Sequence, residues 1–310
     1  MMLSVIIPTY GREERLCQCL EDVLKQEWSE CETIVVDQTP HHQPATIAFL
    51  RSVARRIRHI RLSRPSVTVA SNEGARLATG EILVFLDDDI RIPDADFLRR
   101  HAACYLDVSI GAVAGRVRDP RDPAGHCFDP RSADPVWGWY YTEWDHGTRA
   151  DVVTAPGANM SCRKHVFTQL GGFDERFTGN AARFENDFCL RVRKAGYRVV
   201  FEPSADVLHY YNSDGGHNNR HLYGMSEESH TWYASYFRNM VYATLKHMPV
   251  RVWPLVFWKL WRQHVCNRPF LRAGLRFVLK RHRVFAKGLW EGLQVGKRVH
   301  THGATSERHA

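Results

Sequence analysis

Short apolar runs alternate with amphipathic stretches along residues 1–200. Four of these runs are rich in β-branched residues and end at polar or turn-forming residues, as buried strands do. They lie at 3–8, 33–37, 59–62 and 81–87. Between them, apolar residues recur at helical spacing, and the clearest example is Leu16, Leu20, Val23 and Leu24. Continuous apolar strands that alternate with helices predict an α/β fold with a parallel sheet covered on both faces.

The pattern changes twice further along the chain. A fifth strand is predicted at 110–117, and the Pro- and Asp-rich stretch 119–130 after it predicts a long loop. Residues 185–196 have helical spacing that ends at Gly196, and a strand follows. From about residue 232 the sequence is aromatic and basic, again at helical intervals.

Charge divides the chain into two parts. Residues 246–310 hold 14 Lys and Arg against 2 Asp and Glu, a net charge of +12, which leaves −4 of the total of +8 for residues 1–245. This break predicts an α/β domain over 1–230 and a basic amphipathic helical tail over 231–310. The eight cysteines include no Cys-x-x-Cys pair and are interpreted as reduced thiols of a cytosolic protein. Neither a signal peptide nor a membrane-spanning helix is expected.

Three carboxylates, Asp87 to Asp89, stand at the predicted carboxyl end of the strand 81–87. Ligands of open α/β sheets bind outside the carboxyl ends of the strands. Adjacent carboxylates repel one another unless a cation offsets them, and Mg²⁺ binds carboxylates together with substrate phosphates. The alternative is a solvated acidic turn before the next helix, but the place at the strand end favours a metal and diphosphate site.

Two further strand ends carry polar residues at the same predicted edge. The first strand ends in PTYGR, where Gly11 permits unusual dihedral angles, but no Walker or GxGxxG loop is present. Asp37 ends the second strand and is suited to accept from a nucleobase N–H or a ribose hydroxyl. An isolated Asp at a strand end is more often a cap of a turn or helix, so that interpretation stays open.

Taken in order, six segments resemble family 2 glycosyltransferases of the GT-A fold. They are SVIIPTYGR, VVDQT, ASNEGARLATGEILVFLDDDI, GGFDERF, FENDFCLRVRKAGYRV and ADVLHYYN, and they span about residues 3–212. The resemblance implies a nucleotide-binding domain with a mainly parallel sheet flanked by helices. Within it, residues 1–117 form the nucleotide-binding half and residues 118–230 the acceptor-binding half.

The resemblance also implies roles for individual residues. The nucleotide-binding residues are Thr9, Tyr10, Arg12, Asp37, Asn72, Asp87 and Asp88. Asp89 binds Mn²⁺ or Mg²⁺, and His209 completes the coordination. Two departures from the family pattern stand out: Gln38 follows Asp37 where a second Asp is commoner, and Ser71 replaces an Arg before Asn72. Arg76 is a candidate to replace that charge.

Aligned on DFCLR, Glu185 takes the position of the family's catalytic base, with Asp187 in reserve. A base opposite the leaving diphosphate gives single displacement and hence inversion. The other interpretation of Asp187, a helix cap paired with Arg191 four residues later, stays open.

The aromatic cluster at 137–144 and the tail are candidates for binding the acceptor and its surroundings. Trp137, Trp139 and Trp144 lie where the family carries acceptor loops, although packing under a long loop explains them equally well. Basic amphipathic helices in the tail are typical of anionic membrane surfaces, while packing on the catalytic domain or in a dimer is the alternative. No nucleic-acid motif accompanies the charge, so nucleic acid is not expected as a partner.

These observations predict an inverting, metal-dependent transferase that moves a sugar from a nucleotide-sugar donor to a saccharide or lipid-linked acceptor. We expect it at the cytoplasmic face of the membrane, in cell-surface polysaccharide or lipid-linked glycan synthesis. Two alternatives are a nucleotidyltransferase, for which the Gly-rich basic first loop is missing, and a non-catalytic nucleotide-sugar or membrane-binding module. The sequence specifies neither the sugar, the nucleotide, the acceptor nor the oligomeric state.

Overall fold

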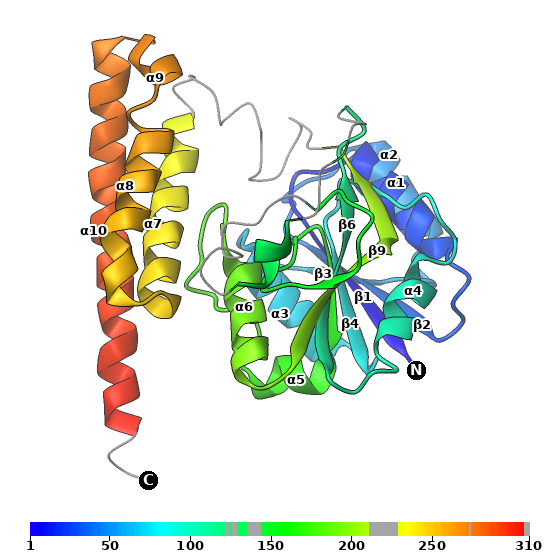
Figure 1. Cartoon of the computed structure of the whole chain (residues 1–310). Coiled ribbons are helices and arrows are strands. Elements are labelled where there is room, and N and C mark those ends of the chain that lie inside the picture. The colour runs from blue at the N-terminus through cyan, green and yellow to red at the C-terminus, as the bar shows by residue number, and fades with distance from the viewer. Residues whose placement is uncertain (122–124, 126–128, 135–143, 211–228, 273, 307–310) are drawn as a thin grey trace. The chain divides into compact units, whose positions relative to one another are not determined.

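The structure is a computed structural model of the chain. It describes all residues except 122–124, 126–128, 135–143, 211–228, 273 and 307–310 (Figure 1). The chain forms two compact units. The first comprises 1–174 and 184–216, and the second comprises 175–183 and 217–310. The second unit thus includes a short segment, 175–183, that lies within the range predicted for the first domain.

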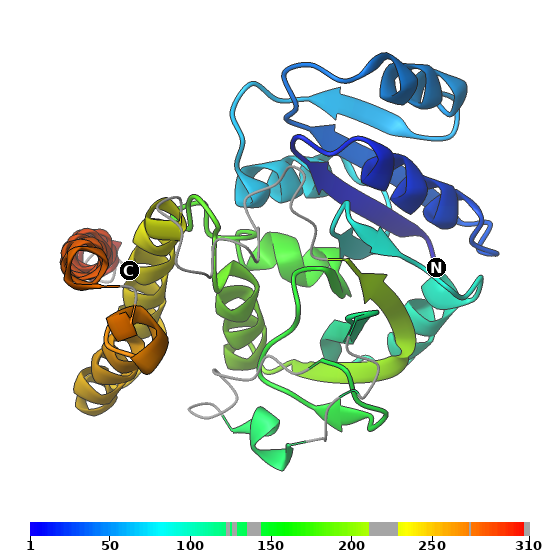
Figure 2. The ribbon, with the colours of Figure 1, turned by 90° about the horizontal axis from the view of Figure 1, so that it is seen from above.

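A mixed sheet forms the centre of the first unit, and Figure 2 shows its strands side by side from β3 toward the long, curved β9. The strand order is β3-β2-β1-β4-β8-β6-β9-β5, and β7 pairs with β9. The strands described are β1 Leu3–Thr9, β2 Cys31–Asp37, β3 Arg58–Arg61, β4 Ile82–Leu86, β5 Ile90–Arg91, β6 Ile110–Arg118, β7 Ala150–Asp151, β8 Asn159–Arg163 and β9 Arg198–His209.

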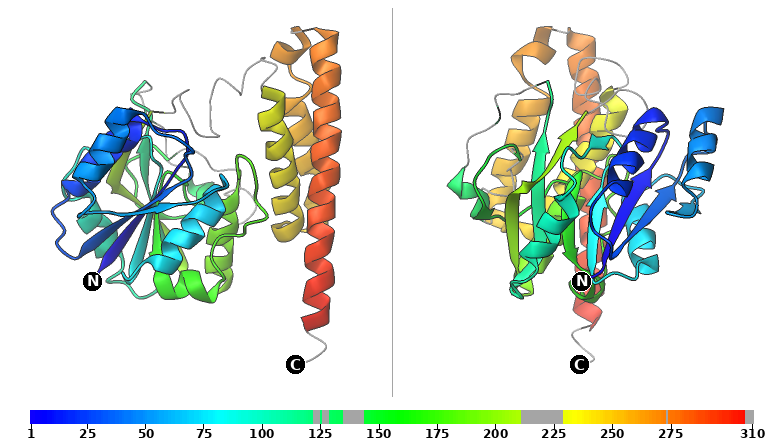
Figure 3. Two further views of the ribbon diagram at one scale, coloured as in Figure 1. Left: turned by 180° about the vertical axis from the view of Figure 1, so that it is seen from behind. Right: turned by 90° about the vertical axis from the view of Figure 1, so that its right-hand side faces the viewer.

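Helices cover both faces of this sheet, with α3, α5 and α6 on one face and α1, α2 and α4 on the other (Figures 1 and 3). Their bounds are α1 Glu14–Leu24, α2 Pro44–Ser52, α3 Val67–Leu77, α4 Phe97–Cys104, α5 Lys164–Gln169 and α6 Phe184–Lys194. The predicted α/β fold with strands from four apolar runs is confirmed. As predicted, α6 is followed by Gly196, whose φ of +90° suits a residue without a Cβ.

The sheet is parallel in one half and mixed in the other. β3, β2, β1 and β4 are parallel neighbours, as continuous apolar strands between helices predict. β8 then pairs antiparallel with both β4 and β6, and β6 pairs parallel with β9. The short β5, directly after the acidic residues, pairs antiparallel with the end of β9. These last pairings join distant parts of the chain.

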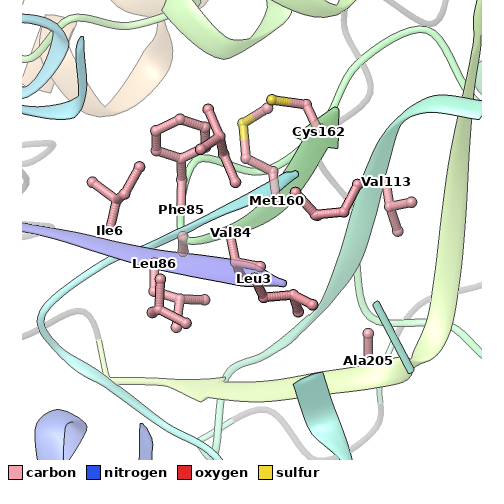
Figure 4. Close-up of a cluster of buried hydrophobic side chains, with 14 of the residues drawn as sticks. Leu3, Ile6, Val84, Phe85, Leu86, Val113, Met160, Cys162 and Ala205 are labelled. Carbon is pink, nitrogen blue, oxygen red and sulfur yellow. The ribbon is translucent and has the colours of Figure 1, made fainter. Parts of the chain in front are cut away.

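The core of the first unit lies between the sheet and its helices (Figure 4). Leu3, Ile6 and Val84 are completely buried in adjacent strands, as expected of strands covered on both faces. The ring of Phe85 lies 5.3 Å from that of Phe167 and 4.9 Å from that of Phe173. This packing fixes β4, at whose end the acidic residues stand.

The second unit consists of helices. These are α7 Ser229–His247, the 3-10 turn Val250–Val252, α8 Trp253–His264, α9 Arg268–Arg272 and α10 Leu275–Ser306. Figure 3 shows α7, α8 and α10 packed side by side. Trp232, Tyr233, Phe237 and Val265 form a small apolar core between them. In the part of the chain that is described, no helix is both long and apolar enough to cross a membrane.

Glycines line the contact between α7 and α10. Gly288, Gly292 and Gly296 are spaced four residues apart, so they lie on one face of α10. A Cβ on Gly292 would lie 2.7 Å from Cβ of Val241 and 2.8 Å from the carbonyl oxygen of Arg238. The two helix backbones are therefore as close as residues without side chains allow.

The segment 175–183 packs on α7. The carbonyl oxygen of Arg176 accepts from Arg238 Nη1 at 2.8 Å, and that of Thr178 accepts from Asn239 Nδ2 at 2.8 Å. Two residues near its end, Ala181 and Arg183, have positive φ values of 46° and 78°. Such angles are unfavourable for residues with a Cβ, so α7 holds this segment in a strained conformation.

Candidate active site

The acidic turn Asp87–Asp89 lies at the carboxyl ends of β1 and β4. β1 and β4 are parallel neighbours, which brings Thr9 and Arg12 to this turn. The Thr9 hydroxyl donates to Asp88 Oδ2 at 2.6 Å. Arg12 Nη2 donates to Asp89 Oδ2 at 3.0 Å, and its Nε lies 3.4 Å from Asp88 Oδ1. The side chains of Arg12 and Asp89 are each only 4% exposed, so the ion pair is buried.

His209 joins the turn from the end of β9. Pairing of His209 with Ile90 across β9 and β5 places its ring beside the carboxylates. Nε2 lies 2.9 Å from Asp89 Oδ1 and 3.6 Å from Asp87 Oδ2. The three potential ligand atoms of Asp87, Asp89 and His209 all lie within 4.8 Å of one another. Two carboxylates and one imidazole at this spacing fit a divalent metal ion.

Electrostatics at the turn also favour a cation. Burial and the negative charge of Asp89 raise the pKa of Asp88 to about 7, despite Arg12 and the Thr9 hydrogen bond. Burial acts to raise the pKa of Asp89 as well, but His209 and Arg12 outweigh it and lower that pKa to about 2. Burial acts to lower the pKa of His209, yet Asp89 raises it. The buried carboxyl groups of Asp88 and Asp89 and the half-buried one of Asp87 thus share two cationic side chains, and a metal ion would compete with the His209 proton.

Asp37, at the end of β2, is surrounded by protein groups. Its Oδ1 accepts from the backbone N–H of Thr39 at 2.8 Å. Its Oδ2 lies 2.9 Å from His59 Nε2 and 3.0 Å from His42 Nε2, with Arg61 Nη1 at 3.5 Å. Burial acts to raise the pKa of Asp37, but the hydrogen bonds from His59, Thr39 and His42 hold it well below the ordinary value. Its contact with a nucleotide stays a prediction.

Sequence reasoning did not identify His42 and His59. His59 lies on β3, the parallel neighbour of β2, and pairs with Val35 in the ladder. The strand-end argument applied to Asp37 points to Arg61, its partner in the ladder, whereas His59 lies two residues before that end and no local signal indicates it. His42 Nδ1 also lies 3.1 Å from Glu13 Oε1, so its ring bridges two carboxylates. Among the described residues, the rings of these two histidines and the guanidinium of Arg61 surround Asp37 at the β2–β3 end of the site.

Asn72 and Tyr10 stand in different surroundings. The Asn72 side-chain amide accepts from the backbone N–H of Phe173 and donates to its carbonyl oxygen, both at 2.9 Å. It therefore ties α3 to the turn at Gly171–Gly172. Tyr10 follows Thr9 at the end of β1 and is half-buried. The nucleotide-binding roles of both residues stay predictions.

The two candidate bases differ sharply in burial. Asp187 has a completely buried side chain and accepts from Arg191 Nε at 2.9 Å. Arg191 in turn donates to the carbonyl oxygens of Leu170 and Gly172. Glu185, two residues earlier in the same helical turn, is only half-buried. The pairing of Asp187 with Arg191 is thus present, whereas the side chain of Glu185 is partly exposed and buries its Oε2.

Residues 156–158 bring Glu185 and the acidic turn to the same loop. A Cβ on Gly157 would lie 3.9 Å from Glu185 Cδ. The carbonyl oxygen of Ala158 is 3.4 Å from the backbone nitrogen of Asp87. Glu185 and Asp87 therefore flank this short segment, which connects into β8.

Of the predicted acceptor residues, only Trp144 lies in the described part of the chain. Trp137 and Trp139 fall within 135–143, outside the described residues. Trp144 is 8% exposed, and its ring centroid lies 5.8 Å from that of Phe201 in the core. Trp144 therefore packs in the core, as one of the two interpretations of the aromatic cluster predicts.

Curated relatives are similar to about two thirds of the chain. An uncharacterized protein of Sinorhizobium fredii is 26% identical over 70% of this chain and 25% of its own length. An O-antigen biosynthesis protein of Myxococcus xanthus is 27% identical over 67% of this chain and 17% of its own. A glucosyl-dolichyl phosphate glucuronosyltransferase of Haloferax volcanii is 25% identical over 67% of this chain and 69% of its own length. The chain thus spans a quarter or less of the first two.

Solved structures share the fold. A mannosyltransferase from Pyrobaculum calidifontis, solved with GDP-Man and Mn²⁺, superposes with a TM-score of 0.58 at 19% identity, covering 98% of this chain and 79% of that one. GalNAc-T7, solved with UDP, GalNAc and Mn²⁺, gives a TM-score of 0.54 at 15% identity, covering 86% of this chain and 55% of that one. The sheet and its helices are thus of the GT-A type. The sequence profile described as Glycosyl transferase family 2 matches residues 4–170, more than half of the chain, and the chain belongs to that family.

Proposed function

We propose that the protein transfers a sugar from a nucleotide-sugar donor to an acceptor hydroxyl with inversion, in a metal-dependent single displacement. The observation that carries this proposal is the cluster of Asp87, Asp89 and His209, whose ligand atoms lie within 4.8 Å of one another. It stands at the carboxyl ends of parallel strands, where α/β proteins bind nucleotides. Glu185 faces the same loop.

Asp87, Asp89 and His209 would hold the metal ion. When bound, this ion supplies positive charge for the leaving nucleoside diphosphate. Carboxylates suit both Mg²⁺ and Mn²⁺, whereas an imidazole ligand is more typical of transition metals. The mixed ligand set therefore favours Mn²⁺ over Mg²⁺. Arg12 neutralises the remaining charge on Asp88 and Asp89.

Glu185 is the proposed base. Its half-buried carboxylate is able to accept the proton of an acceptor hydroxyl, so that the oxygen attacks the sugar as the diphosphate leaves. Asp187 instead keeps Arg191 in place, and through it the turn at Gly171–Gly172. A base on the face opposite the leaving group gives inversion.

Cell-surface polysaccharide or lipid-linked glycan synthesis is the proposed setting. The relatives named for O-antigen biosynthesis and for glucuronosyl transfer to glucosyl-dolichyl phosphate support a saccharide or lipid-linked acceptor. The seven described cysteines are free, which fits a reducing compartment and the cytoplasmic face of a membrane.

The second unit supports attachment to an anionic membrane surface. Large apolar side chains are exposed on α8 and α10 beside exposed Arg and Lys residues. The exposed apolar residues are Leu255 (49%), Trp258 (57%), Leu275 (73%), Leu279 (51%) and Trp290 (63%). Helices with exposed apolar and basic residues bind the interface of anionic bilayers. We expect the full chain to co-sediment with vesicles that contain phosphatidylglycerol, and a Trp258→Ser/Trp290→Ser variant to bind them less.

Thermal stabilisation by nucleotide sugars tests the transferase proposal. The full chain is heated with UDP-, GDP-, dTDP- and CMP-sugars, with and without Mn²⁺, beside the variant Asp89→Ala. Asp107→Ala is the control, because Asp107 is an exposed carboxylate just before β6, at the opposite edge of the sheet. Stabilisation by one nucleotide class that needs Mn²⁺ and is lost only in Asp89→Ala supports the donor site.

The anomeric configuration of the product, determined by NMR, then tests inversion. Lack of stabilisation by every nucleotide sugar would contradict the proposal and favour a non-catalytic membrane-binding module.

A further inference from the structure

An irregularity in the sheet lies just before His209. Gly115 on β6 pairs with Glu202 on β9, but the next residue, Arg116, pairs with Asp206. The register therefore jumps over residues 203–205, which form a bulge in β9. Bulges bend a strand and redirect the residues that follow, and His209 follows this one closely. The position of the proposed metal ligand thus depends on how the bulge is held.

One side chain, Asn159, holds the bulge together. Asn159 is completely buried at the start of β8, where it pairs with Leu86. Its Nδ2 donates to the carbonyl oxygen of Arg116 on β6 and to that of Ala205 on β9, both at 2.9 Å. Both hydrogens of the amide group are used, and they join the two strands at the point where the register changes.

Gly115 and His101 keep Asn159 in this orientation. A Cβ on Gly115 would lie 2.2 Å from Asn159 Nδ2, so only glycine leaves room for the amide group. His101 Nε2 lies 3.0 Å from Asn159 Oδ1, and Nδ1 lies 2.8 Å from the Ser161 hydroxyl. An amide oxygen only accepts, so Nε2 donates to it. Burial lowers the pKa of His101 to about 4, so the ring is neutral at pH 7.

We propose that Asn159 is a positioning residue of the acidic site, because its amide fixes β9 at the bulge and thereby places His209 against Asp87 and Asp89. Asn159 lies on β8, where it pairs with Leu86 of β4, the residue directly before Asp87. One residue thus connects both halves of the metal cluster. The inference rests on the proposed metal site, but the fixing of β9 is independent of any metal.

Two measurements on the full chain test this inference. Hydrogen exchange of residues 205–210 in metal-free protein reports how firmly β9 is held. Calorimetric titration with Mn²⁺ measures the metal affinity, which depends on how the ligands of the cluster are placed. The variants are Asn159→Ala and Gly115→Ala. The matched control is Cys162→Ala, which removes a buried sulfur from the same strand but leaves the hydrogen bonds of Asn159 and His101 intact.

We expect Asn159→Ala and Gly115→Ala to speed exchange at 205–210 and to weaken Mn²⁺ binding by about tenfold or more, as loss of groups that orient metal ligands does. The control changes neither by more than about twofold. The effect of Gly115→Ala also shrinks in an Asn159→Ala background, because the clashing amide is absent. That double variant separates positioning from a general loss of folding.

Exchange and Mn²⁺ affinity unchanged from wild type in Asn159→Ala would overturn the inference while the proposed function stands. A wild-type chain that binds no Mn²⁺ would instead remove the proposed metal site, and the exchange measurement alone would still decide whether Asn159 holds β9.

Discussion

Replacing Gly292 by alanine sets two physical effects against each other. In a helix interior, alanine is favoured over glycine by about 1 kcal/mol, so the helix alone would become more stable. At Gly292, however, the new Cβ would lie 2.7 Å from Cβ of Val241, whereas ordinary contacts begin at 3.4 Å. The backbone oxygen of Arg238 is also only 2.8 Å away, so no side-chain rotation relieves the overlap. The helices have to separate.

The required displacement sets the magnitude. α7 and α10 must move apart by about 0.7 Å, the difference between these two distances. Overpacking of a well-packed contact costs about 1–3 kcal/mol, and separation also loosens the contacts of Gly288 and Gly296. Because the backbone oxygen of Arg238 is part of the overlap, we use the upper half of this range, about 2–3 kcal/mol. Less about 1 kcal/mol for the better helix propensity, the net free energy of opening of α7 and α10 should fall by about 1–2 kcal/mol.

Hydrogen exchange of the α7 amides measures this directly, because a chain of two units need not unfold in one step. Protection of α7 should fall by about 5–30-fold in Gly292→Ala. Ala286→Gly, on the exposed face of α10, is the control and reports the propensity effect alone. If α7 in Gly292→Ala were as protected as in wild type, or more so, close packing of the two backbones would not limit this position.

Three further predictions follow from buried polar groups. Because the pKa of His101 is about 4 in the folded protein and about 6.5 when unfolded, the unfolded chain binds more protons between these values. The free energy of unfolding should thus fall by up to about 3 kcal/mol from pH 7 to pH 4, and a urea titration of His101→Phe should show less of this fall. In Asp187→Ala, the free energy of unfolding should fall by about 3 kcal/mol, because Arg191 loses its carboxylate partner. Glu185→Gln should abolish sugar transfer with little change in Tm. If Asp187→Ala were stable but inactive, the roles of the two residues would be reversed. Arg281→Met should raise the free energy of unfolding by about 1 kcal/mol, because the fully buried charge of Arg281 is costly: burial lowers its pKa to about 10. A lower Tm of the variant would show that the contacts of Arg281 with aromatic rings and with Ser229 compensate this cost.

Local patterns predicted the parallel half of the sheet and the acidic turn. Continuous apolar strands between amphipathic helices have few other arrangements, and Asp87 to Asp89 follow one of them directly. Resemblance to a family supplied His209, which spacing alone could not bring to the turn. The two-residue strand β5 and the antiparallel β8 depend on pairing between distant residues, so no local pattern indicates them.

Burial also separated residues that the sequence treats alike. Glu185 and Asp187 are two carboxylates in one helix turn, and only the structure shows that one is buried with Arg191. No sequence pattern indicates a role for Asn159, because its hydrogen-bond partners come from three separate segments. Its role depends on the bulge between β6 and β9, which has no sequence periodicity.

The strained segment 175–183 has a consequence for how the protein can be cut and assembled. The chain leaves the sheet at residue 174, joins the helical unit, and re-enters the sheet unit at Phe184, the first residue of the helix that carries Glu185. A protein shortened before α7 would lose the partners of Arg176 and Thr178 and release the left-handed residues just ahead of α6. We therefore expect a chain cut before α7 to have a less ordered entry into the helix that carries the proposed base, because α7 holds residues 175–183.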